Sequence, residues 1–262
     1  MHNELFTIGP FTFYGYGLML ALGIITSILV TDHQAKKTGM NSDDVWGMFL
    51  WVLILGVVGC KVLFWIVNIK DIINDPSILL DISNGFVIYG GIIFGLSTLV
   101  LYTKKKNMDT ALVLDMFLPT VSLAQGIGRI GCFLAGCCYG KPTDLPIGIT
   151  FTSSGYAPNG ISLYPTQLMM SAGDFVIAAI LFRYAKNNKF KGSVGTLYLI
   201  LYGTGRFLIE FFRGDPRGTV GPLSTSQFIS VIFVIIGLMS YYLVKKKMSG
   251  TVPDEPVVSD KK

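Results

Sequence analysis

The sequence is poor in charge and in histidine, and each shortage excludes a class of protein. Only 14% of its 262 residues are charged and 51% are hydrophobic, whereas soluble domains carry about 25% charge. This composition excludes an ordinary soluble globular protein. Two histidines, His2 and His33, are too few for a histidine-rich metal site. No CxxC, HExxH or P-loop pattern occurs, so the sequence predicts no metal and no cofactor.

The sequence has long apolar runs instead, each close to the roughly 20 residues that cross a bilayer. One glycine- and proline-rich segment, 128–167, interrupts them, and such a backbone must be covered by protein or line a wet cavity. We predict an all-α polytopic membrane protein with one domain over residues 1–248 and a disordered polar tail over 249–262. The seven predicted spans are 15–31, 45–67, 86–103, 110–127, 168–184, 195–212 and 225–244.

The basic residues give these spans a direction, because cytoplasmic loops are enriched in lysine and arginine. Clusters follow the first, third, fifth and seventh spans. This alternation predicts an outer N-terminus, a cytoplasmic C-terminus and an outward-facing segment 128–167 in a bacterial cytoplasmic membrane. The net charge of +5 therefore reflects topology and does not predict nucleic-acid binding. The clustered residues are Lys36, Lys37, Lys104, Lys105, Lys106, Arg183, Lys186, Lys189, Lys191, Lys245, Lys246 and Lys247.

Arg129 stands out at the outer end of the fourth span. An arginine at membrane depth is costly and is usually functional or paired. Glycines allow close backbone approach, and an arginine beside exposed N–H groups favours phosphate binding. The alternative is a snorkelling arginine at a helix end. The neighbouring glycines are Gly126, Gly128, Gly131, Gly136 and Gly140.

A second charged group closes the sixth span. Arg206, Glu210 and Arg213 are spaced four and three residues apart, which predicts one helical face. The group could form an internal salt bridge, or one arginine could pair with Glu210 while another faces an anionic lipid headgroup. Both can hold at once because a guanidinium has five donors.

Three cysteines fall in segment 128–167: Cys132, Cys137 and Cys138. The outer side of a bacterial membrane is oxidising, so a disulfide from Cys132 to Cys137 or to Cys138 is expected. Three thiols could also bind a soft metal, but without a nearby histidine we favour no metal site.

Several short motifs occur together with these residues and in a fixed order. They are YGLM at 16–19, the paired glycines Gly90 and Gly91, GxGRxGxFxxGxxYG at 126–140, PTQL at 165–168 and YGxxRFxxEFFR at 202–213. In this combination the chain resembles the prolipoprotein diacylglyceryl transferase family from about Phe6 to Val244.

The resemblance implies a membrane enzyme that moves diacylglyceryl from phosphatidylglycerol to the lipobox cysteine of a preprolipoprotein, the first step of lipoprotein maturation, and releases glycerol phosphate. It implies that Arg129 and Arg206 hold the lipid phosphate. The other residues that it assigns to phosphatidylglycerol are Tyr16, Gly90, Gly91, Gln167, Tyr202 and Arg213. The expected partners are this lipid and the signal-peptide segment, and we favour a monomer.

Five positions depart from the family pattern. Tyr89 and Tyr164 replace histidines, and Met170 replaces an acidic residue. Cys132 and Cys137 replace an asparagine and a glutamate. The proton acceptor is therefore open, with Tyr89, Glu210 and a cysteine thiolate as candidates. Two other functions also stay open, an outer-face thiol–disulfide protein and a phosphatidylglycerol-binding or -transferring protein with a different acceptor.

Overall fold

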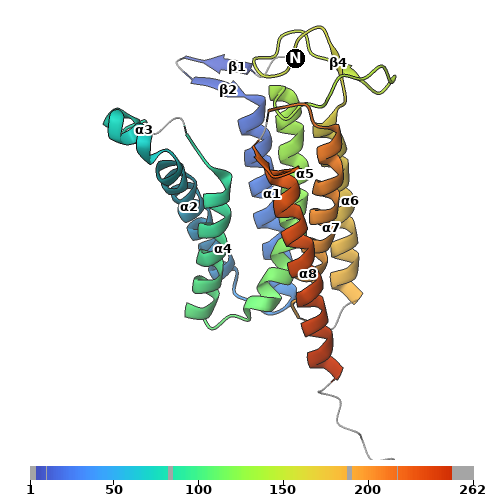
Figure 1. Ribbon diagram of the computed structural model, residues 1–262. Helices are drawn as coiled ribbons and strands as arrows, with labels where there is room; N and C mark the ends of the chain where they lie inside the picture. The colour runs from blue at the N-terminus through green and yellow to red at the C-terminus, as the bar shows by residue number, and fades with distance from the viewer. Residues whose placement is uncertain (1–3, 10, 82–84, 188–190, 217, 250–262) are drawn as a thin grey trace, which may run out of the picture. The chain divides into compact units, whose positions relative to one another are not determined.

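The computed structural model describes residues 4–9, 11–81, 85–187, 191–216 and 218–249. These residues form two compact units, one of Met1–Ser27 with Phe117–Lys262 and one of Ile28–Met116, called unit 1 and unit 2 below. A long helix occupies each of the seven predicted spans. The helices are α1 (Gly15–Lys37), α2 (Ser42–Val67), α4 (Ile88–Lys105), α5 (Thr110–Ala135), α6 (Thr166–Asn187), α7 (Ser193–Ile209) and α8 (Thr225–Ser249) (Figure 1).

Five of these helices, α1, α2, α5, α6 and α8, are long and apolar enough to cross a membrane. Helix α7 has 17 residues and α4 ends on a pair of lysines, so both are weaker candidates. The predicted largely helical membrane protein is confirmed at this level. Of the predicted tail, only Ser249, the end of α8, is described; residues 250–262 lie outside the described residues.

Short elements connect the long helices. They include three small antiparallel hairpins, which an all-α prediction does not contain. The pairs are β1 (Glu4–Ile8) with β2 (Phe11–Tyr14), β3 (Ile149–Thr150) with β4 (Ser162–Leu163), and β5 (Thr219–Val220) with β6 (Leu223–Ser224). The helical connectors are α3 (Ile69–Asn74), η1 (Pro76–Leu79) and η2 (Glu210–Phe212).

Helix α5 runs farther than predicted. We expected an irregular segment from residue 128, but the helix continues to Ala135 and ends where Gly136 adopts φ +76°. The apolar residues after Arg129 sustain the helix until this left-handed glycine ends it. Consequently Gly128 and Gly131 lie inside a helix, where backbone N–H groups bond along the helix. The predicted cradle of bare N–H groups is wrong at these two positions.

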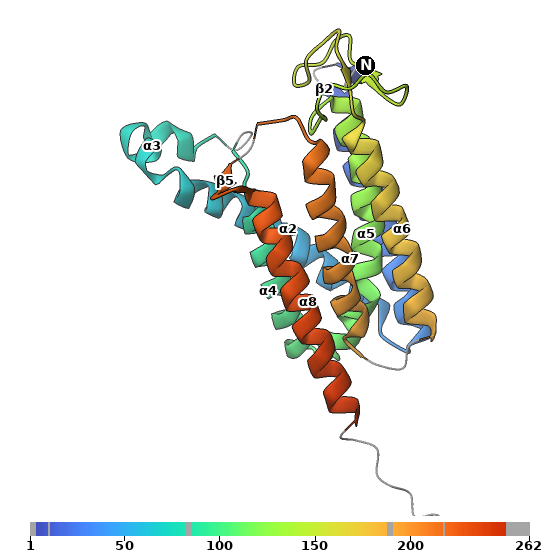
Figure 2. The same cartoon turned by 45° about the vertical axis from the view of Figure 1, so that its right-hand side comes forward.

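Unit 1 is held together by small polar side chains between helices. Ser27 on α1 donates to Thr120 on α5 over 2.8 Å, and Ser171 on α6 donates to the carbonyl of Gly126 over 2.7 Å. Helices α7 and α8 pack closely along their length, and Gly203 lies against the backbone of Ser230 (Figure 2). Small and hydroxylated residues are the usual means of helix association in membranes.

Unit 2 is built around the pair α2 and α4. A Cβ atom on Gly90 would collide with the backbone of Gly59, and one on Gly91 would lie 2.6 Å from the Cys60 sulfur. Two glycines thus let the helix backbones touch. At one end of this unit, Lys106 forms a 2.7 Å salt bridge with Asp44.

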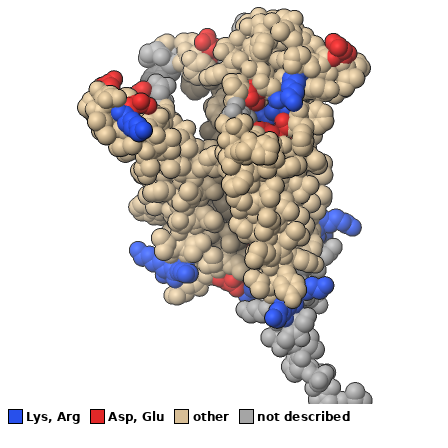
Figure 3. All heavy atoms as spheres, viewed as in Figure 1, with Lys and Arg blue, Asp and Glu red and all other residues tan. Residues whose placement is uncertain are grey.

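Each unit exposes large apolar side chains along its helices, for example Leu50 and Val57 on α2 and Ile232 and Leu238 on α8. Figure 3 shows the visible middle part of these helices free of lysine, arginine, aspartate and glutamate, with the charges near the helix ends. Surfaces of this kind suit lipid contact.

Candidate functional site

Three loops of unit 1 meet at one end of its helices and position the site. Lys141 N–H donates to Phe212 over 2.8 Å, Gly214 N–H donates to Tyr139 over 3.0 Å, and Tyr164 N–H donates to Lys141 over 3.0 Å. These backbone bonds join the segments that follow α5, precede α6 and follow α7. The motifs at 126–140, 165–168 and 202–213, distant in sequence, therefore form one site.

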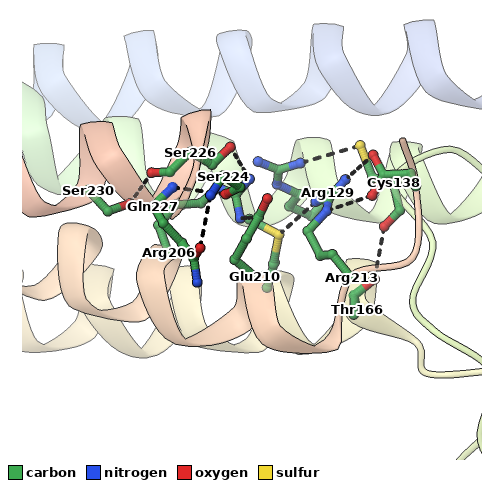
Figure 4. A network of polar contacts seen from close by, with 12 residues as sticks. Arg129, Cys138, Thr166, Arg206, Glu210, Arg213, Ser224, Ser226, Gln227 and Ser230 are labelled. Atoms are coloured by element: carbon green, nitrogen blue, oxygen red, sulfur yellow. Dashed lines mark hydrogen bonds and ion pairs between the residues drawn. The ribbon is translucent and has the colours of Figure 1, made fainter. Parts of the chain in front are cut away.

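Arg129 projects from the penultimate turn of α5 into this site. Its Nη1 lies 3.9 Å from the Cys138 sulfur, at the edge of a sulfur hydrogen bond (Figure 4). Among the described residues, no carboxylate forms a salt bridge with Arg129. A half-buried guanidinium without a carboxylate partner is suited to an anionic ligand.

Arg206 on α7 is placed differently, because its charge is already matched. Its Nη1 forms a 2.5 Å salt bridge with Glu210, and its Nη2 donates to Ser226 Oγ over 2.7 Å. We predicted that one arginine pairs with Glu210, and in the structure this arginine is Arg206. Ser226 opens α8, so Arg206 also ties α7 to α8.

Arg213 does not lie on that helical face, and the prediction that it does is wrong. Helix α7 gives way to η2 at Glu210, and Arg213 itself is extended, with φ −77° and ψ 141°. Its side chain makes two 2.8 Å bonds to Asp215, and its Nη1 lies 3.6 Å from the sulfur of Met170. Burial opposes the charged form, but the Asp215 hydrogen bonds outweigh it and raise the pKa of Arg213.

The three cysteines form a cluster in which all sulfur atoms lie within 4.8 Å of one another. Each is a free thiol in the structure, and the expected disulfide stays a prediction. Hydrogen bonds from Cys132 and Cys137 lower the pKa of Cys138, and Arg213 lowers it further. The same contacts keep the proton on Cys137 and raise its pKa.

Gln167 and Tyr16 both lie beside this cluster. Gln167 is fully buried and its Nε2 donates to the Cys137 carbonyl over 2.8 Å, so it joins α6 to the turn after α5. Tyr16 opens α1 with its backbone against Gly131, and its hydroxyl interacts electrostatically with Arg129 and the cysteines.

A cavity of about 220 Å³ lies between α6 and α7, beside the charged network. Tyr202 and Arg206 line it from α7, and Tyr202 stacks on Tyr198 with ring centroids 5.5 Å apart. Leu208, also on its lining, is 56% exposed at the surface of the unit. The cavity therefore extends from Arg206 to the exposed apolar surface of unit 1.

Asp174 lines the same cavity and was missed by sequence reasoning. It is 4% exposed, and its Oδ2 has no hydrogen-bond partner among the described residues. Arg129 and Arg206 both interact electrostatically with its carboxylate. Its signal in the sequence was an aspartate inside an apolar run, one helical turn beyond Met170, the position where the family pattern has an acidic residue.

The remaining predicted residues lie in different surroundings. Gly90 and Gly91 belong to unit 2, where they contact α2, and Tyr89 beside them is exposed. Tyr164 packs edge-on against Phe212 with centroids 5.4 Å apart. The long apolar helices of unit 1 define a helical membrane protein, in which arginine and cysteine side chains gather beside a cavity.

Known proteins agree with this class and refine it. The sequence model of the prolipoprotein diacylglyceryl transferase family matches residues 3–243. A protein of Clostridium tetani, named phosphatidylglycerol–prolipoprotein diacylglyceryl transferase, is 52% identical over 92% of this chain and 97% of its own length. A Clostridium perfringens protein with that name and the number 2 is 44% identical over 89% of this chain and 92% of its own. A Finegoldia magna protein of that name is 34% identical over 95% of this chain and 98% of its own.

The chain therefore belongs to the prolipoprotein diacylglyceryl transferase family. The match covers both units and every motif from which the resemblance was inferred.

Proposed function

We propose that this chain transfers the diacylglyceryl group of phosphatidylglycerol to the lipobox cysteine of a preprolipoprotein and releases glycerol phosphate. The observation that supports this proposal is the similarity to relatives named for this activity, which extends over about nine tenths of the chain. The arrangement of unit 1 is consistent with it, because an unpaired arginine, a cavity and a carboxylate occur together.

The same proposal includes the membrane arrangement. All seven long helices cross the bacterial cytoplasmic membrane, with the N-terminus outside and the C-terminus in the cytoplasm. In support, Arg183, Lys245 and Lys246 lie toward the ends of α6 and α8 that are far from the site. By the positive-inside rule those ends face the cytoplasm and the site faces outward.

Phosphatidylglycerol enters from the bilayer between α6 and α7, past Leu208. Arg129 binds its phosphate, and Arg206 adds positive potential while Glu210 and Ser226 hold its side chain. This assignment gives the two arginines unequal roles. Arg129 contacts the lipid phosphate directly, whereas Arg206 is held by Glu210 and Ser226 and acts through its charge.

The lipobox thiolate attacks the terminal glyceryl carbon, the C–O bond to phosphate breaks, and glycerol phosphate carries away the electron pair. Arg129 neutralises the charge that grows on the departing phosphate. We propose Asp174 as the acceptor of the thiol proton, because this residue lines the cavity and its Oδ2 has no hydrogen-bond partner among the described residues. Tyr89, Glu210 and a cysteine thiolate remain the alternatives from the sequence, and Glu210 is engaged by Arg206.

The reaction consumes no redox equivalent and no nucleotide. We therefore propose that the chain acts without a cofactor. We also propose that it acts as a monomer, with phosphatidylglycerol and the lipobox segment as its partners.

The direct test is mass spectrometry of a lipobox peptide incubated with the purified chain in vesicles. The proposal predicts a diacylglyceryl mass gain with phosphatidylglycerol, and none with phosphatidylcholine or with a peptide whose lipobox cysteine is serine. No gain on the cysteine peptide would reject the transferase. A peptide disulfide in its place would support the thiol–disulfide alternative, and lipid retention without transfer would support a lipid-binding protein with another acceptor.

A further inference from the structure

The cysteine cluster is a second feature of the site, and the reaction proposed above, with Asp174 as the proton acceptor, gives it no role. Cys132 comes from the last turn of α5, and Cys137 and Cys138 come from the turn that follows. Their three sulfur atoms lie within 4.8 Å of one another, and the Cys132 side chain is buried. Three thiols at this separation can share one small cation after slight adjustment.

The turn that carries two of these thiols is held in an unusual conformation. Cys138 has φ +60°, a left-handed conformation that residues other than glycine rarely adopt. Thr166 Oγ donates to the Cys138 carbonyl and Gln167 Nε2 to the Cys137 carbonyl, both over 2.8 Å. Strained residues persist only where their surroundings determine them, and they concentrate at ligand sites. The cluster is therefore organised before any ligand arrives.

The charges around the cluster favour a thiolate at Cys138. Arg129 Nη1 lies 3.9 Å from the Cys138 sulfur, and Arg213 also interacts with Cys138. Three thiolates around a monovalent cation carry two negative charges in excess, which neighbouring guanidinium groups offset. Without them, a multiply charged metal–thiolate group at a membrane surface would be unfavourable.

We propose that Cys132, Cys137 and Cys138 bind a thiophilic monovalent cation, Cu(I), as a trigonal tris-thiolate site, and that the occupied site competes with lipid phosphate for Arg129. The competition for Arg129 rests on the proposed function, whereas the copper site does not. On binding, three Cu–S bonds form and each thiol releases its proton to solvent, with no change of oxidation state.

Copper(I) fits this donor set better than zinc. Structural zinc takes four ligands in a tetrahedron, and the cluster supplies three thiols with no fourth cysteine, histidine or carboxylate within the described group. Soft thiolate ligands select Cu(I), zinc or iron–sulfur clusters, and zinc and iron–sulfur clusters usually take four such ligands. The proposal reverses our expectation from the sequence of no metal site, because the sequence did not show that the three sulfur atoms converge.

Metal binding is measured on the full-length, reduced protein in detergent, without transferase turnover. A chromophoric bis-chelate of Cu(I), such as the bathocuproine disulfonate complex, reports by its loss of absorbance how much metal the protein removes. The test variant replaces all three cluster cysteines by serine. Cys60→Ser is the matched control, because Cys60 lies on α2 in the other unit.

The wild type and Cys60→Ser should each take one Cu(I) per chain, and the triple variant should bind at least about 100-fold more weakly. Equal binding by the triple variant, or equal loss in Cys60→Ser, would overturn the site. X-ray absorption on the copper-loaded wild type identifies the atoms bound to the metal, so this test does not depend on whether the triple variant folds. Three sulfur neighbours support the proposal, and two sulfurs or any nitrogen neighbour contradict it.

The competition for Arg129 is tested with lipid in the same titration. Phosphatidylglycerol should weaken Cu(I) binding by about tenfold relative to equal amounts of phosphatidylcholine. Equal effects of the two lipids would overturn the competition. The transferase is judged separately by the peptide mass gain in metal-free buffer, so its failure cannot be mistaken for failure of the copper site.

Discussion

The charged site of unit 1 and the α2–α4 interface of unit 2 bring helices together in opposite ways. The first buries ionised groups, with Glu210 and Arg213 each less than 10% exposed. The second replaces side chains by glycine, so that the backbones of Gly59 and Gly90 touch. Both regions carry motifs that resemble the family pattern, yet the phosphate-binding arginine that we propose lies in the first.

This contrast separates binding residues from packing residues. Burying a charge away from water costs free energy, and a protein keeps such groups where function or pairing offsets the cost. A glycine contact stabilises helix association without such a cost. We therefore expect mutations in the unit 1 site to impair transfer, and mutations at the glycines of unit 2 to impair stability.

The largest effect is expected for Arg129→Ala. Removing the unpaired guanidinium should reduce kcat/KM for lipid transfer by at least about 100-fold, because one preorganised electrostatic contact to the departing group contributes that much. The readout is the initial rate of peptide lipidation in vesicles. Arg183→Ala, which removes an exposed arginine from α6, is the control and should change the rate less than about twofold. Comparable losses of rate in the two variants would show that Arg129 has no special role in transfer.

The next effect concerns the proton acceptor. Asp174→Asn should lower kcat by about 100-fold and remove the decline of kcat toward low pH, whereas Tyr89→Phe should lower it less than about tenfold. The measurement is a pH–rate profile of each variant with a saturating peptide. A large loss of kcat in Tyr89→Phe, with a wild-type pH–rate profile for Asp174→Asn, would indicate that Tyr89 of unit 2 is the proton acceptor.

Gly90→Ala probes the other side of the contrast. Its new Cβ meets the Gly59 backbone, so the free energy of unfolding should fall by about 1–3 kcal/mol and lower the Tm in detergent. Gly95→Ala on the same helix is the matched control, because its Cβ would meet its nearest neighbour, Val52, at 3.7 Å. If Gly90→Ala instead kept its Tm and raised the KM for phosphatidylglycerol, the glycine would be a lipid contact, as its motif implies.

The smallest effect is expected at Ser226, whose Oγ accepts from Arg206. Ser226→Ala removes one hydrogen bond of about 1 kcal/mol and should lower kcat/KM by about fivefold, since Arg206 is then oriented by fewer partners. Ser230→Ala, one turn along α8, removes a hydrogen bond to the Ser226 carbonyl that does not involve Arg206. Its kcat/KM should stay near the wild-type value, and equal losses would assign the effect to helix packing.

The helices were predictable from the sequence because apolar runs and lysine clusters are local signals. The end of α5 was not, since the glycines near Arg129 suggested an open backbone and the left-handed turn at Gly136 decides where the helix stops. The hairpins also escaped prediction. Strands of two residues, such as β3 and β5, are fixed by the partner segment rather than by their own composition.

Within the site, the spacing of Arg206, Glu210 and Arg213 predicted that one arginine pairs with Glu210, but it did not decide which one. It did not predict that Arg213 leaves the helix, since its partner Asp215 requires an extended backbone. The surroundings of Asp174 depend on how α5, α6 and α7 come together, and the convergence of the three cysteines depends on the left-handed turn after α5. Distances of that kind follow from packing and are not encoded in residue spacing.

The central claim is that Arg129 binds the phosphate of phosphatidylglycerol directly. Native mass spectrometry of the chain released from phosphatidylglycerol-containing micelles measures this most directly, because it counts lipid retained per molecule without any turnover. The account predicts one retained phosphatidylglycerol on the wild type and on Arg183→Ala, and none on Arg129→Ala. Full retention of the lipid by folded Arg129→Ala would contradict it.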